Sequence, residues 1–221
     1  MNLERYNHFF KQVIDWNHVI GITKAKINDP QTINLYQKLT DEELQETFDA
    51  IQAQDSVEIK DGVFDVFVTG SMLNYLHTGF SSTIYSMKRI PVKSKHVFTD
   101  LITDIGSDIV ESYPAHISLL KLISIAEQYF GTEEMDKVFV DGIESNNSKI
   151  IFDITKSNLK KQLAFANAKY EGQYENLKLV NRKYGPKKRT VYVIRADYGE
   201  GKLLKPESFN ELQIREQNVT L

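Results

Sequence analysis

The residues of this sequence best suited to chemistry are acidic side chains in two short clusters. The first cluster holds Glu42, Glu43 and Glu46, and the second holds Glu58 and Asp61. Side chains three or four positions apart share one face of a helix, so a helical segment would present each cluster together. Carboxylates held close together repel one another unless cations neutralise them, and their hard oxygen atoms suit Mg²⁺. Mg²⁺ in a cleft lined by carboxylates favours chemistry on phosphates.

Two neighbouring helices are predicted to position these clusters. Apolar residues at helical spacing extend from Asp29-Pro30 to about residue 53, and a second apolar run covers roughly 56–77. A short break lies between them, near 52–55. If the break folds the two helices side by side, four or five carboxylates converge on one point.

The second helix is apolar nearly all round, which predicts that it is buried. Asp61 and Asp65, four positions apart on this helix, are then hard to place in solvent and need partners. Lys60 is the one basic residue near them in the sequence.

The same residues also fit an interpretation without any metal. Thr40 to Glu43 and Asp55 to Glu58 both match the spacing of a capping box. Glutamates are common on solvated helix faces, and 30 of the 221 residues are acidic. From the residues alone, metal binding and helix capping with surface charge both remain open.

Three motifs in order resemble those of a known family, the all-α nucleoside triphosphate pyrophosphohydrolases. These include MazG-like, phosphoribosyl-ATP pyrophosphohydrolase-like and phage-type proteins. The first motif is EExxE at 42–46 with ExxD and GxxD at 58–65, the second is SNxSK at 145–149, and the third is GKxxK at 201–205. The sequence departs from the family pattern at Tyr36, where Arg is often expected, and at 150–189, which looks like an insertion.

The resemblance implies hydrolysis of a (d)NTP to a (d)NMP and pyrophosphate, with Mg²⁺ as cofactor and Mn²⁺ as a substitute. It implies four metal ligands: Glu43, Glu46, Glu58 and Asp61. Catalysis is assigned to Glu42 and Glu43, where Glu42 is either a further ligand or the general base that takes a proton from water. Family members assemble as homodimers or homotetramers, which we also expect here.

Four further residues are candidates for contact with the substrate. Lys149 is a candidate phosphate ligand, Asn146 a contact to phosphate or base, and Asp65 a contact to a sugar hydroxyl or a cationic side chain. The alternatives are an ordinary helix-ending loop at 145–149 and a structural pairing of Asp65. Asn17, near the end of the first helix, is a candidate base contact, whereas the neighbouring Trp16 is expected to pack in the core.

The predicted fold is all-α, with a helical bundle core of four main helices and a small C-terminal α/β appendage that contains a β-hairpin. Helices are expected over 2–20, over the two acidic segments, over 97–109 and 117–130, and from 131 to about 143, with a loop at 79–95. Residues 1–150 form the predicted pyrophosphohydrolase core. Residues 151–221 form an extension with a polar, partly helical segment at 155–184, a strand at 190–195 and a short return strand at 202–204.

Composition narrows the remaining function classes. The chain has no cysteine, which excludes disulfides, thiolate metal sites and Cys nucleophiles and fits a reducing, cytoplasmic location. No apolar run is long enough for a membrane span. The net charge of −3 disfavours a general attraction to nucleic acid. The alternative to an enzyme is a non-catalytic helical interaction protein that offers its acidic face to a basic partner.

Overall fold

A computed structural model describes residues 3–79, 109, 116–185, 187–196, 203–212 and 214. The chain divides into two compact units. Unit 1 comprises residues 1–14, 23–142 and 213–221, and unit 2 comprises residues 15–22 and 143–212. The described residues are mostly helical, with one small antiparallel sheet in unit 2, as the predicted fold class requires. None of the described helices is long and apolar enough to cross a lipid bilayer.

Five α-helices of the described residues contribute to unit 1, and two of them, α1 and α6, run on into unit 2. Their bounds are α1 Leu3–Ile20, α2 Pro30–Ala53, α3 Ser56–Thr78, α5 His116–Phe130 and α6 Thr132–Ser148. The helices predicted at these places are confirmed. The loop expected at 79–95 lies outside the described residues apart from Gly79. The helix expected over 97–109 also lies outside them apart from Ile109, which is helical and buried.

Asp29 fixes the start of α2. Its carboxylate accepts hydrogen bonds from the backbone N–H of Thr32 at 2.9 Å and from the Thr32 hydroxyl. These bonds, with the nearby Lys26 ammonium, lower the pKa of the Asp29 carboxyl group. Pro30 then occupies the first turn, where its missing N–H costs nothing.

The centre of unit 1 is aromatic, and α3 lies within it. Phe139 of α6 contacts Phe67 and Phe64 of α3 at centroid distances of 5.0 and 5.5 Å, and Phe9 of α1 at 5.3 Å. Gly142 allows this packing, because a Cβ there would lie 2.5 Å from the Phe64 ring. The prediction that the second acidic segment belongs to a buried helix is confirmed, since most residues of α3 are buried.

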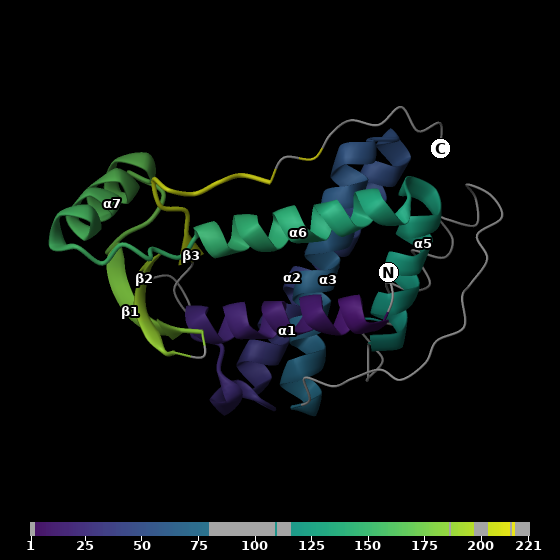
Figure 1. Ribbon diagram of the computed structural model, residues 1–221, viewed down its shortest axis with the longest axis horizontal. Helices are drawn as coiled ribbons and strands as arrows, with labels where there is room; N and C mark the ends of the chain where they lie inside the picture. The colour runs from purple at the N-terminus through teal and green to yellow at the C-terminus, as the bar shows by residue number, and fades with distance from the viewer. Residues whose placement is uncertain are drawn as a thin grey trace. The chain divides into compact units, whose positions relative to one another are not determined.

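The described residues of unit 2 form α7, Lys156–Lys169, and three strands, β1 Lys178–Tyr184, β2 Arg189–Arg195 and β3 Leu203–Leu204. The strand order is β1-β2-β3, and both pairings are antiparallel. The predicted strand and its short return strand are confirmed as β2 and β3. The predicted two-stranded hairpin was incomplete, because residues 178–184, expected in a partly helical segment, form β1 (Figure 1).

Each face of this sheet carries a separate hydrophobic core. Val191 and Val193 of β2 pack with Val19 and Ile150 on one face. Ile194 of β2 points to the opposite face. There it packs with buried residues that include Ala166 of α7, and with the partly buried Leu159 and Tyr192. Since alternate residues of a strand face opposite sides, one strand serves both cores.

Candidate functional site

The acidic segments belong to a helical hairpin in unit 1. Helix α2 ends at Ala53, Gln54 adopts a left-handed conformation with φ 61°, and α3 begins at Ser56. Asp55 caps α3 by accepting hydrogen bonds from the backbone N–H groups of Val57 and Glu58 at 3.0 and 3.1 Å. The short break folds the two helices side by side, which was the condition for their carboxylates to converge (Figure 1).

The two helices come into close contact at Thr47 and Gly62. A Cβ atom added to Gly62 would lie 2.2 Å from Thr47 Oγ1 and 3.2 Å from Thr47 Cα. Only glycine therefore fits at this position. The Thr47 hydroxyl is held in place, since it donates a hydrogen bond to the Glu43 carbonyl oxygen at 2.7 Å.

The six candidate carboxylates fall into two groups by exposure. Glu43, Asp61 and Asp65 are half-buried, and each makes an interaction with another group. The exposed group consists of Glu42, Glu46 and Glu58.

The crossing also orders these residues along the hairpin axis. Glu43 lies one turn before Thr47 in α2, and Asp65 lies three positions after Gly62 in α3. Because the chain reverses direction between the helices, both residues lie at nearly the same level along the axis. They are on the side of the crossing away from the link at 54–55. Glu58 lies one turn before Gly62, towards the link. At 1.5 Å per residue, Glu43 and Glu58 are separated by about 12 Å along the axis.

In the part of the chain that the structure describes, no group of three or more His, Cys, Asp or Glu side chains is placed to hold one metal ion. The four predicted ligands are thus carried by adjoining helices but are not gathered into a single cluster. Their ligand role, and the catalytic role of Glu42 and Glu43, stay predictions.

Lys60, the only basic residue near Asp61 and Asp65 in the sequence, has a different carboxylate partner. Its side chain is fully buried, and its Nζ lies 2.8 Å from Glu134 Oε1 of α6 and 5.7 Å from the centroid of the Phe130 ring. The fold uses this ammonium to join α3 to α6.

A second candidate region lies in unit 2, around Lys149. The helix expected to end near residue 143 continues to Ser148, so Ser145 to Ser148 form its last turn and not a loop. Tertiary contacts support this turn, because Trp16 Nε1 donates to the Asn146 carbonyl oxygen at 2.9 Å. Ser148 Oγ donates to the Ser145 carbonyl oxygen at 2.7 Å.

The Lys149 ammonium lies among an amide and two aromatic rings. It donates to Asn146 Oδ1 at 2.7 Å, and it lies 5.6 Å from the Trp16 ring centroid and 5.9 Å from that of Phe209. Trp16 is half-buried, with its ring between the core and this ammonium. Trp16, predicted to pack in the core, and Lys149, the candidate phosphate ligand, are therefore direct neighbours.

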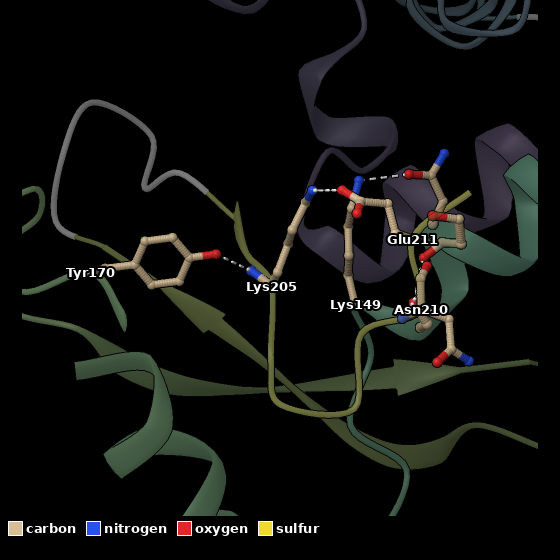
Figure 2. Close-up of polar contacts among 8 residues, drawn as sticks. Lys149, Tyr170, Lys205, Asn210 and Glu211 are labelled. Atoms are coloured by element: carbon tan, nitrogen blue, oxygen red, sulfur yellow. Dashed lines mark hydrogen bonds and ion pairs between the residues drawn. The ribbon is translucent and has the colours of Figure 1, made fainter. Parts of the chain in front are cut away.

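The GKxxK segment, which follows later in the chain, contributes Lys205 to the same group of side chains. Lys205 Nζ lies 4.3 Å from the Phe209 ring centroid. It also lies 3.5 Å from Glu211 Oε1, and the Lys205 N–H donates to the Tyr170 hydroxyl at 3.3 Å (Figure 2). Lys202 lies outside the described residues. Lysines from two motifs 56 positions apart thus share one aromatic ring, which sequence reasoning had not identified.

Ser148 ties the two segments together. Its hydroxyl accepts a hydrogen bond from the Asn210 N–H at 2.9 Å (Figure 2). We call Trp16, Asn146, Lys149, Lys205 and Phe209 the lysine–aromatic cluster. Asn17, the remaining substrate candidate, is fully buried at the end of α1, where its carbonyl oxygen accepts from the Ile22 N–H at 2.9 Å.

A cavity of about 420 Å³ opens beside the same two segments. Amide, carboxylate and aromatic side chains contribute to its lining: Glu144, Asn147, Phe152, Asp153, Asn158 and Gln162. Gln162 is held in place, because its Oε1 accepts from the Glu207 N–H at 2.8 Å. The volume is within the range of small-molecule sites.

Comparison of the chain with protein-family models, with curated proteins and with solved structures found no match.

Proposed function

We propose that this protein is a Mg²⁺-dependent nucleoside triphosphate pyrophosphohydrolase that converts a (d)NTP into the (d)NMP and pyrophosphate. The observation that carries the proposal is the close crossing of α2 and α3 at Thr47 and Gly62. It supports a site in which half-buried carboxylates of two adjoining helices act together.

The donor set suits the proposed cofactor. Glu43, Glu46 and Asp61 offer only carboxylate oxygens near the crossing, which Mg²⁺ prefers and Mn²⁺ accepts. Glu58 offers the same kind of donor atom closer to the link, about 12 Å from Glu43 along the hairpin axis. Bound Mg²⁺ would neutralise phosphate charge and lower the pKa of the attacking water. Glu42, exposed beside this set, is either a further ligand or the group that accepts the proton from that water.

The lysine–aromatic cluster is the proposed binding element for the nucleotide. Two ammonium groups near one ring favour a polyphosphate, and the rings of Trp16 and Phe209 offer faces on which a base can stack. Lys205 and Glu211 are 40% and 73% exposed, so their ion pair is weak and a phosphate can replace the carboxylate at little cost.

The decisive experiment measures pyrophosphate release from canonical and modified NTPs and dNTPs with Mg²⁺ or Mn²⁺. Glu43→Gln should lower kcat about 100-fold or more, whereas Lys149→Gln should mainly raise KM. Glu133→Gln, a change to an exposed acid in the first turn of α6, is the matched control and should leave both constants unchanged.

Direct metal binding gives a readout that does not depend on turnover. Calorimetry should detect Mn²⁺ binding to the wild-type protein and to Glu133→Gln but not to Glu43→Gln. If the wild-type protein neither binds Mn²⁺ nor releases pyrophosphate from any nucleotide tested, the proposal is wrong.

The second candidate function is a non-catalytic interaction module with an acidic face. The exposure of Glu42, Glu46 and Glu58 favours it, because exposed carboxylates need no metal to neutralise them. A protein that binds basic peptides through these residues, without Mn²⁺ binding or turnover, would support this alternative.

A further inference from the structure

The net charge of −3 conceals a strong separation of charge along the chain. Residues 178–195, which form β1, β2 and the turn between them, contain seven Lys or Arg residues and no Asp or Glu. All 30 acidic residues therefore lie elsewhere, against 20 basic ones. We call residues 178–195 the basic hairpin.

Four of the basic side chains gather at the turn end of this hairpin. Lys187 and Lys188 lie in the turn, which the Lys188 N–H closes by donating to the Gly185 carbonyl oxygen at 3.0 Å, and Arg189 begins β2. Lys183 reaches across the ladder to Thr190 Oγ1 at 2.9 Å. All four are exposed, and among the described residues no ion pair to an acidic side chain involves them.

A pair of aromatic rings, one exposed and one half-buried, adjoins these charges. Tyr184 is the cross-strand partner of Arg189, and its ring lies 5.1 Å from that of Phe152 at an interplanar angle of 86°. Phe152 is 51% exposed, which is high for such a large apolar side chain. It is held beside the sheet by its neighbour Ile151, which exchanges backbone hydrogen bonds of 2.7 and 3.0 Å with Tyr192 of β2.

We propose that the tip of the basic hairpin binds single-stranded nucleic acid. Lys187, Lys188 and Arg189 contact phosphates, and the exposed face of Phe152 stacks on a base. Positive charge interleaved with an exposed aromatic ring is the combination that single-strand binders use. An unpaired base is required, because bases in a duplex are already stacked on one another.

Fluorescence anisotropy with labelled oligo(dT) of 20 nucleotides tests this site. Three phosphate contacts predict that log K falls with log salt with a slope of about −2. Lys187→Gln with Lys188→Gln should reduce the slope to about −0.7 and weaken binding about 25-fold at 0.1 M salt. Phe152→Leu should weaken binding about tenfold with the slope unchanged.

The matched control removes two charges from the same unit at another place. Lys156 and Lys160 are exposed on α7, and replacing both with Gln should leave the affinity for oligo(dT) within about twofold. Lys149→Gln should also leave it unchanged, which separates this site from the proposed nucleotide site.

Several outcomes would overturn the proposal. One is an equal loss of affinity in the hairpin variant and in the α7 control, which would indicate attraction to positive charge in general. Others are tighter binding to a duplex of 20 base pairs than to oligo(dT), and no binding of oligo(dT) at 50 mM salt. Binding to vesicles containing phosphatidylserine, with no binding of oligo(dT), would identify the hairpin as a membrane contact.

Discussion

Replacing Gly62 with alanine tests the crossing on which the acidic site depends. The new methyl group would lie 2.2 Å from Thr47 Oγ1, 3.0 Å from Thr47 Cβ and 3.2 Å from Thr47 Cα. Favourable carbon–carbon contacts lie at about 3.5–4.0 Å, so the helices must separate by about half an ångström even after the hydroxyl moves. Moving the hydroxyl also breaks its hydrogen bond to the Glu43 carbonyl oxygen.

The expected cost follows from two opposing effects. Forcing a methyl group into a packed contact costs about 1–3 kcal/mol, whereas alanine favours a helix over glycine by about 1 kcal/mol. We therefore expect Gly62→Ala to lower the free energy of unfolding by up to about 2 kcal/mol, measured by urea denaturation. Thr47→Ala in the same background should recover part of this loss, which a double-mutant cycle detects.

The same substitution should weaken Mn²⁺ binding, because a wider hairpin moves Glu43 away from Asp61 and Asp65. Gly142→Ala is the control, since its Cβ would lie 2.5 Å from the Phe64 ring and would strain the core without touching α2. It should destabilise the protein and leave Mn²⁺ affinity unchanged. If Gly62→Ala instead makes the protein more stable, the helices cross more loosely than we infer.

Three further predictions concern individual contacts. Glu134→Gln removes the negative charge that lies 2.8 Å from the buried Lys60 ammonium and should cost about 2–4 kcal/mol of unfolding free energy, whereas Lys60→Met should cost less; urea denaturation of both checks this. Because the folded-state pKa of Asp29 is lowered, its stabilising effect is present above the ordinary pKa of about 3.9 and lost as the pH falls through the lowered value. Asp29→Asn should therefore flatten the fall in stability below about pH 4, as seen by circular dichroism during acid titration. Trp16 is the only tryptophan, so its fluorescence should change when pyrophosphate binds near Lys149, and Lys149→Gln should abolish that change.

Local chemistry made most helix boundaries predictable from the sequence. Asp29 and Asp55 cap α2 and α3, and Gly79 ends α3 in a left-handed conformation with φ 70°. Each signal acts through hydrogen bonds or backbone freedom within a few residues, so the sequence alone contains it.

Strand β1 and the last turn of α6 could not be predicted from such local signals. Strand β1 lacks clean alternation, because Leu179 and Val180 are adjacent apolar residues that face opposite cores. The last turn of α6 is rich in Ser and Asn, which favour loops, but the Trp16 indole stabilises it from 130 positions away. The meeting of Lys149 and Lys205 at Phe209 likewise depends on contacts between distant segments.

The length of the link between α2 and α3 decides which carboxylates can act together. Only Gln54 and Asp55 link the two helices, so each residue of α2 lies at a fixed height along α3. The contact between Thr47 and Gly62 defines this register. A longer link would let α3 slide along α2 in the direction of its own C-terminus and bring Glu58 closer to Glu43. With this short link, the pairing of Glu43 with Asp65 is favoured over the pairing of Glu43 with Glu58. Asp65→Asn should then impair Mn²⁺ binding more than Glu58→Gln does, and the reverse order would refute this register.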